Sequence, residues 1–242
     1  MTHTLPDYST KYKLTTIFGQ IDTGELAARL GSIDTFDRRG CVMWMDDFEN
    51  NLNSWQLDYT GLGTTVITNT QQRFGASSMY MDVGLAVNDV NSAYRYLPFR
   101  AVSKMGLETA FQITAVQTTL WFWIDWLDGT TRYRGQIYYN QGAGNLRYLN
   151  SGLGDTSFAN VTPLLLNSGM FHIIKIVIDP TDYTFNRIIL DNNTWDLSNI
   201  PLPGVADATS PCIRVGFKIQ NGQLNAHQEM YIDGVIVTDN EP

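Results

Sequence analysis

The feature that most constrains the fold is a pair of strand-like segments at the two ends of one long region. The first runs from Trp44 to Glu49, and the second runs from Met230 to Asp239. Each alternates large apolar side chains with acids or small residues, which is the period of two that a half-buried strand shows. Strands from the two ends of a β-sandwich commonly lie side by side in one sheet. We therefore expect these two segments to be neighbours.

The region between these ends contains many short apolar segments separated by turn residues. Glycine, asparagine and aspartate clusters such as Gly61 to Gly63, Asp128-Gly129 and Asn140 to Gly144 supply the turns. No segment with a helical period interrupts the series, and regular strand spacing without crossover helices indicates antiparallel sheets. The predicted fold is an all-β, antiparallel jelly-roll β-sandwich. The expected strands cover residues 42–48, 54–59, 64–68, 77–83, 92–97, 106–114, 118–126, 131–139, 145–149, 171–178, 183–190, 194–197, 212–219 and 228–237.

Residues 1–41 differ from the rest and are expected to form an N-terminal arm, while residues 42–242 form the sandwich domain. Residues 22–31 resemble one short helix, with Asp22 or Thr23 as its N-cap and Gly31 as its C-cap. An isolated helix of this length is marginal in water, so it must pack on its own sandwich, on a second subunit or on a larger assembly. The apolar side chains that would anchor the arm are Leu14, Ile17, Phe18, Leu26 and Leu30.

The charge of the chain restricts its partners. The formal net charge is −8, and all of it falls outside the first 41 residues, which carry five bases and five acids. An acidic body repels phosphate backbones, so no nucleic-acid partner is expected. The N-terminal sequence lacks the pattern of a secretory signal, and no apolar stretch has the length of a membrane span. Cys41 and Cys212 could pair, although two buried free thiols fit their positions better.

Three segments carry a resemblance to known proteins. Residues 47–55, 74–81 and 231–235 resemble the opening, second-strand and closing segments of jelly-roll carbohydrate-binding modules, while residues 171–179 and 187–191 are similar to the paired strands of concanavalin-A-like and laminin-G-like sandwiches. In some such modules, acids of the opening and closing strands share a structural calcium ion. The resemblance therefore implies Glu49 and Asp233, with Asp47 nearby, as calcium ligands, provided that backbone carbonyls complete the shell. Solvated strand-end acids are the alternative.

Catalytic groups are scarce, and we expect no enzymatic activity. The three histidines are His3, His172 and His227, and the last two have the positions of core or edge residues in strands. No phosphate-binding glycine loop and no metal-binding histidine pair occur. Glycosidases of the resembling fold often carry a Glu-x-Asp-x-x-Glu string for their two carboxylates, and this chain has no such string.

An aromatic strand offers the best candidate for a binding face. Trp121, Trp123 and Asp125 share one face of residues 118–126, while the alternate residues share the other and are assigned to the core. The face with Asp125 is expected to be open, which would leave both tryptophans partly exposed. The next strand adds Arg132, Arg134, Gln136 and Tyr138. Such a face suits glycan hydroxyls or a protein partner equally, and an ordinary outer sheet with two core tryptophans remains an alternative.

Taken together, these patterns predict a non-enzymatic protein that assembles or docks. Its layout, a jelly roll with an arm, is similar to bacteriophage virion proteins such as capsid decoration, tail or fibre proteins. This resemblance implies an oligomer, partners that are copies of itself or other virion proteins, and a place in an assembled particle made in the cytosol. Polysaccharide is a further expected ligand. A freestanding carbohydrate-binding module is the alternative function, followed by a sandwich-fold glycoside hydrolase.

Overall fold

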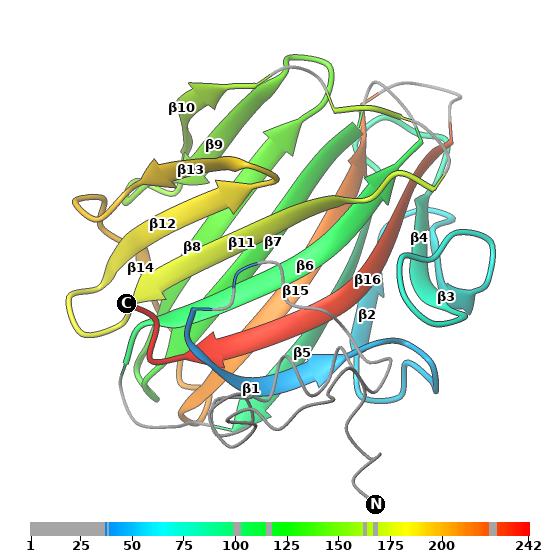
Figure 1. The fold of residues 1–242 in the computed structure, drawn as a ribbon. Coiled ribbons are helices and arrows are strands. Elements are labelled where there is room, and N and C mark those ends of the chain that lie inside the picture. The colour runs from blue at the N-terminus through cyan, green and yellow to red at the C-terminus, as the bar shows by residue number, and fades with distance from the viewer. Residues whose placement is uncertain are drawn as a thin grey trace, which may run out of the picture.

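Two antiparallel sheets lie face to face in the computed structural model, which describes residues 37, 39–98, 103–114, 118–161, 164–166, 169–222 and 227–242 (Figure 1). All regular elements of this part of the chain are strands. Sheet A contains, in spatial order, β13 (Asn193–Asp196), β12 (Thr184–Leu190), β11 (His172–Asp179), β6 (Met105–Ile113), β16 (Gln228–Asp239), β4 (Ser78–Val83) and β3 (Thr64–Thr68), with β1 (Cys41–Asp46) also paired to β16. Sheet B contains β10 (Asp155–Asn160), β9 (Asn145–Leu149), β8 (Thr131–Asn140), β7 (Thr118–Leu127), β15 (Cys212–Asn221), β5 (Val90–Pro98) and β2 (Gln56–Tyr59), with β14 (Gly204–Ala206) also paired to β8.

The predicted pairing of the two ends is confirmed. β1 runs antiparallel to the last part of β16, from the pair Cys41 and Asp239 to the pair Asp46 and Val235. The first part of β16 pairs with β4 on the same side, so one long closing strand holds two shorter ones. Figure 1 shows β16 crossing the front of the sandwich with β1 beneath it. The jelly-roll sandwich fold expected from the sequence is therefore the fold of the described residues.

The core lies between the inner faces of the sheets. Phe122 and Ile124 on β7 point inward and are fully buried. Phe122 meets Phe111 of β6 across the sandwich, with ring centroids 4.9 Å apart. Each such side chain contributes roughly 1.5 to 3 kcal/mol when it leaves water. Alternate residues of β7 belong to this core, while those between them are covered on the outer face of the same sheet.

Two strands escaped the sequence prediction, and both are short or polar. β10 contains Phe158 and Ala159 as its apolar residues, and its pairing with β9 is interrupted by a bulge between Ser157 and Ala159. β14 has three residues and pairs with β8 from Thr131 to Tyr133. Neither strand shows the alternation that a half-buried strand needs, so local pattern could not reveal them.

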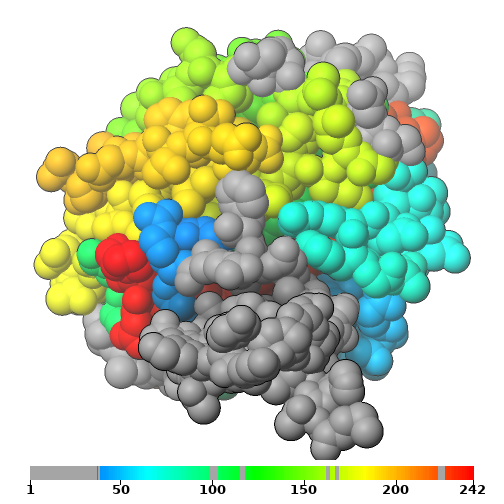
Figure 2. Space-filling model, viewed as in Figure 1, coloured from blue at the N-terminus to red at the C-terminus, as the bar shows by residue number. Residues whose placement is uncertain are grey.

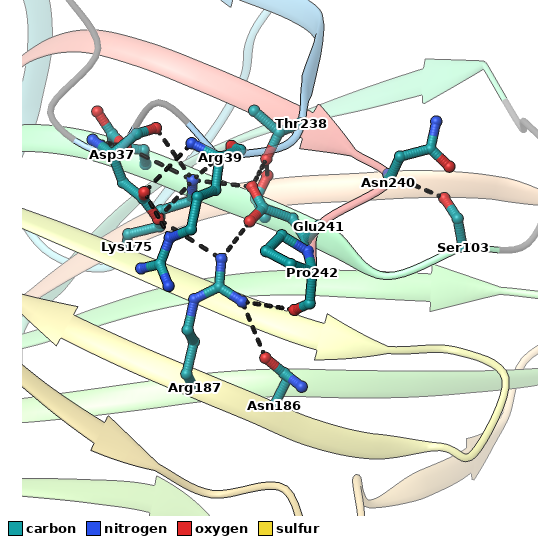
Figure 3. A network of polar contacts seen from close by, with 12 residues as sticks. Asp37, Arg39, Ser103, Lys175, Asn186, Arg187, Thr238, Asn240, Glu241 and Pro242 are labelled. Carbon is teal, nitrogen blue, oxygen red and sulfur yellow. Dashed lines mark hydrogen bonds and ion pairs between the residues drawn. The ribbon is translucent and has the colours of Figure 1, made fainter.

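A network of charges covers the outer face of sheet A. Lys175 of β11 is fully buried, and its Nζ lies 2.8 Å from Glu241 Oε1 and 3.1 Å from Asp37 Oδ2. Glu108, opposite Lys175 on β6, is 3.8 Å away. Figure 3 shows Asp37, Lys175 and Glu241 converging at this point. Lys175 is therefore paired on several sides, as a buried charge must be.

Arg187 of β12 extends the same network. It contacts Glu241 and lies 3.5 Å from Asp37 Oδ2, and it also donates to the carbonyl oxygen of Pro242 at 2.9 Å. Arg39 binds Asp37 at 2.8 Å. Figure 2 shows the blue beginning of the described chain lying against its red C-terminal end. The network thus joins residues near 37, β11, β12 and residues 241–242 into one unit.

Several expectations concern residues outside this description or are corrected by it. The predicted helix at 22–31 and the arm side chains Leu14, Ile17, Phe18, Leu26 and Leu30 lie outside the described residues. Both cysteines are free, as expected. The expectation that both are buried is wrong, because Cys41 is exposed and Cys212 is partly exposed, each at the first residue of its strand.

We predict that Asp37→Asn lowers the free energy of unfolding at pH 7 by about 2 kcal/mol. Burial would raise the pKa of Asp37, but the hydrogen bond from Arg39 and the charge of Lys175 lower it from 3.8 to about 2. The stabilisation is therefore complete above about pH 4 and is lost as the pH falls through about 2. Urea unfolding at several pH values measures it, with exposed Asp182→Asn as control. Equal stability of wild type and variant at pH 7 would contradict the prediction.

Candidate functional site

Three rows of side chains cross the outer face of sheet B. Their members lie directly opposite each other on the four adjacent strands β5, β15, β7 and β8, so they point to the same side. We call these twelve residues the outer-face grid. The first row is Ser92, Lys218, Trp121 and Tyr138, the second is Tyr94, Gly216, Trp123 and Gln136, and the third is Tyr96, Arg214, Asp125 and Arg134.

Asp125 holds the third row together. Its carboxylate is fully buried and accepts two bonds from Arg134, at 2.7 Å from Nε and 2.9 Å from Nη2. Arg214, on the other side, donates from Nε at 2.8 Å and from Nη2 at 2.5 Å. Charge-assisted bonds of this fork-like kind are among the strongest in proteins. One carboxylate therefore positions two guanidinium groups side by side.

Trp123 fills the middle row because its neighbour on β15 has no side chain. A Cβ atom on Gly216 would stand 2.4 Å from Trp123 Cζ2, so only glycine leaves room for the indole there. The guanidinium carbon of Arg134 lies 5.3 Å from the Trp123 ring centroid. The buried Nε1 of Trp123 has no hydrogen-bond partner among the described residues. The floor of the grid therefore holds an unused donor.

Lys218 and Tyr138 flank Trp121 in the first row. Lys218 Nζ lies 4.4 Å from the Trp121 ring centroid, and the Tyr138 ring meets Trp121 edge-on with centroids 5.5 Å apart. Burial lowers the pKa of Lys218, and the charge of Arg134 lowers it further. Burial also raises the pKa of Tyr138. Both titratable groups are thus held in surroundings that disfavour their charged forms.

A hollow adjoins one side of the grid. β8 pairs with β14 through residues 131–133 and with β9 through residues 137–140, so two different strands occupy its outer edge. Between them lies a cavity of about 280 Å³ lined by Arg132, Arg134, Gln136, Tyr138, Leu149, Leu153, Pro203 and Val205. It is near the small end of the usual range for ligand pockets, roughly 300 to 1,000 Å³.

All six residues predicted for the binding face lie on this side of sheet B. Trp121, Trp123, Asp125, Arg134 and Tyr138 are grid members, and Arg132 lies one row further, 3.6 Å from Asp207. The expectation of partly exposed tryptophans is wrong. Trp121 is 9% exposed and Trp123 is 6% exposed, because the long side chains of Lys218 and Arg134 cover them.

Sequence reasoning missed half of the grid, namely the residues contributed by β5 and β15. Arg214 and Lys218 lie about 90 residues beyond Trp121 in the chain, and Tyr94 and Tyr96 precede it. Their alternation with buried neighbours in the two strands was a usable signal for their face. It could not say which other strands would stand beside them.

The grid contains no pair of free carboxylates. Its single acid, Asp125, is committed to two arginines. His172 lies in sheet A, where Asp191 is 2.7 Å from its Nδ1 and the Leu165 carbonyl is 3.3 Å from its Nε2, so its prediction as a core or edge histidine is confirmed. The grid, whose twelve residues all belong to the described chain, therefore lacks the two-carboxylate geometry of a glycosidase.

The three acids predicted to bind calcium hold the chain together in other ways. Glu49 Oε1 accepts the N–H groups of Ala76 and Ser77 at 2.7 and 2.9 Å. Asp233 Oδ2 accepts those of Arg73 and Phe74 at 2.6 and 2.9 Å. These two acids therefore fasten the segment 73–77 to β16 and to the turn that follows β1.

The fit to a cation is partial. Asp47 Oδ1 accepts the N–H of Glu49, and among the described residues no group of three acids, histidines or cysteines gathers as a metal site. Asp233 Oδ1 is buried and has no hydrogen-bond partner among them, and burial raises the pKa of Asp233. This oxygen and backbone carbonyls would have to supply the shell. Calcium binding stays a prediction.

Several solved structures share this fold. No protein-family model and no curated protein matches the chain. A solved endo-β-1,4-glucuronan lyase from Trichoderma reesei is similar at a TM-score of 0.58 and 14% identity, over 82% of this chain and 96% of that one. A Bacillus licheniformis β-glucanase gives 0.51 and 13% over 81% and 98%, and the Emp47p carbohydrate recognition domain 0.50 and 15% over 85% and 99%. The chain also spans 19% of the length of a solved sialidase.

These comparisons correct and limit the functional expectations. We expected no enzymatic activity, and this expectation is wrong. Solved enzymes of two kinds, a lyase and a glucanase, share this fold, so the fold does not exclude catalysis. The similarity to bacteriophage virion proteins finds no support in the comparisons. At these identities the likeness shows the fold alone, which the chain shares with a lyase, a glucanase and a carbohydrate recognition domain. Within the described residues, no helix is long and apolar enough to cross a membrane.

If calcium binds at Asp233, millimolar calcium should raise the melting temperature of the wild type, and a chelator should reverse the rise. A ligand at one hundred times its Kd adds about 2.7 kcal/mol to the stability of the folded state. Asp233→Asn should abolish the response, whereas the turn variant Asp196→Asn should keep it. Differential scanning calorimetry checks both, and a wild type that ignores calcium and chelator shows the prediction to be wrong.

Proposed function

We propose that the protein binds polysaccharide on the outer-face grid, with the hollow beside β8 taking one part of the ligand. The observation that carries the proposal is the grid itself, which combines tyrosine rings, guanidinium groups and an amide on four adjacent strands. Such groups suit sugars, because rings contact their apolar faces while arginine and glutamine bond to their hydroxyls. The solved neighbours of this fold that act on or recognise carbohydrate add support.

The tyrosines are the expected contact residues in this proposal. Trp121 and Trp123 are almost fully covered and serve as the floor, while 37% of Tyr96 remains exposed and Tyr138 lines the hollow. Tyr138 also adjoins Gln136 within the same cavity. A ligand chain would therefore lie over the edges of the first and third rows and enter the hollow at Tyr138.

Polysaccharide binding by the grid predicts that Tyr138→Ala weakens retention on a polysaccharide array by about tenfold, since one aromatic contact is worth roughly 1 to 1.5 kcal/mol. Tyr59→Ala is the matched control, because Tyr59 is a 55% exposed tyrosine on β2 that lies outside the grid. The two variants should keep the wild-type melting temperature within a few degrees. A wild type that binds no polysaccharide, or equal loss in both variants, would refute the proposal.

Assembly through the arm is the second candidate function. It includes the virion component that the layout of the chain suggests, with self-association or docking on other assembly proteins. The supporting observation is the charge network on sheet A, where Asp37 and Arg39 fasten the chain directly after residue 36. Because the chain is fixed to the sandwich at this point, an arm that ends there would connect the sandwich firmly to whatever the arm binds.

Deleting residues 1–36 tests this second candidate while leaving Asp37 and its ion pairs in place. We expect the shortened protein to fold with wild-type β-sheet content by circular dichroism and to lose assembly in native mass spectrometry. The variant Leu26→Asp with Leu30→Asp in the full chain should reproduce the loss. Unchanged oligomeric mass in both proteins would rule the arm out as an assembly element.

A further inference from the structure

The outer-face grid carries an excess of positive charge within an acidic protein. Its three cations, Lys218, Arg214 and Arg134, face the single carboxylate of Asp125, although the chain as a whole has a net charge of −8. Local charge of the opposite sign to the whole molecule concentrates ligands of one kind at one face. The excess therefore needs an explanation at this site.

The charge network on sheet A shows how the same fold treats buried charges without a ligand. There, Lys175 contacts the carboxylates of Asp37 and Glu241, while Arg187 contacts these same two acids. With Arg39 and Glu108 the network holds three cations and three acids. The charges of this network are therefore balanced inside the chain, whereas the grid holds three cations and one acid.

The two arginines keep donors for a ligand. Asp125 accepts from both, so one negative charge serves two guanidinium groups. Arg134 Nη1 donates to Gln136 at 3.1 Å and Arg214 Nη1 donates to the Tyr96 hydroxyl at 3.4 Å. Each guanidinium has five N–H groups, so both keep N–H groups beyond these bonds. The side chains of Arg134 and Arg214 are 22% and 13% exposed, so part of each reaches solvent.

Lys218 is the one cation of the grid for which the described residues supply no counter-ion. Its Nζ lies over the Trp121 ring at 4.4 Å, and none of the ion pairs in the described residues includes it. Burial lowers its pKa, and Arg134 adds repulsion. A partly desolvated ammonium group beside other cations costs stability until an anion reaches it. Trp121 supplies part of that compensation through its ring face.

We propose that the polysaccharide bound by the grid is acidic, with uronate carboxylates that pair with Lys218 and with the free edges of Arg134 and Arg214. The inference rests on the proposed binding function and narrows it to one class of ligand. A carboxylate matches a guanidinium with two parallel bonds and also satisfies an ammonium group.

Binding of four probes to the full chain tests the inference. The probes are polyglucuronate, neutral dextran, dextran sulfate and a single-stranded oligonucleotide of similar length. Isothermal titration calorimetry measures the affinity of each probe at low and at moderate salt. We expect polyglucuronate to bind at least tenfold more tightly than dextran, and its affinity to fall with salt because ion pairs are screened. Polyglucuronate should also bind more tightly than dextran sulfate and the oligonucleotide.

Variants of Lys218 locate the effect. Lys218→Gln should weaken polyglucuronate binding by about tenfold and dextran binding by much less, and Lys218→Arg should restore most of the affinity for polyglucuronate, since the positive charge returns. Lys104→Gln removes a positive charge outside the grid and should change neither. Melting temperatures of all variants show whether the fold is kept.

The outcomes separate this inference from the proposed function. Equal affinity for dextran and polyglucuronate, or an unchanged affinity in Lys218→Gln, would overturn the acidic ligand and leave polysaccharide binding standing. Preference for dextran sulfate would overturn the carboxylate, and preference for the oligonucleotide would overturn the polysaccharide class. If none of the polysaccharides binds, the proposed function fails and this inference fails with it.

Discussion

The antiparallel register of β5, β15, β7 and β8 is the constraint on which both the core and the candidate site depend. Successive side chains of a strand point to opposite faces, so the same four strands supply the core and the outer-face grid. On β7, Phe122 and Ile124 are buried against sheet A while Trp123 and Asp125 face outward. A slip of one residue would exchange these sets and bury the charges, which the core cannot accommodate. The hydrophobic pattern that stabilises the sandwich therefore also sets the rows of the grid.

The charged side chains on the outer faces of the two sheets are paired in different ways. On sheet A, Lys175 and Arg187 are neutralised by acids that come from distant parts of the chain, which fastens residues near 37 to residues 241–242 (Figure 3). On sheet B, Asp125 holds two arginines in place without neutralising the face. One network closes the structure, and the other leaves cations available to a ligand.

Much of the fold was readable from the sequence, whereas the site was readable only in part. The pairing of β1 with β16 was predicted because both segments alternate clearly and bound one domain. β10 and β14 were missed, because three to six residues with little alternation carry no local signal. The openness of the aromatic face was misjudged as well, since the covering side chains come from β8 and β15 rather than from β7 itself.

The sandwich architecture and the face on which Trp121, Trp123 and Asp125 lie both follow from the two-residue period of a strand, so local sequence was enough to predict them. Only the tertiary structure decided which strands became neighbours, and through them that Lys218 and Arg214 stand beside Trp121 and Asp125. It also decided that Glu49 and Asp233 bind backbone N–H groups of the segment 73–77. The physical reason is that side-chain alternation is local, whereas strand pairing joins residues that are far apart in the chain.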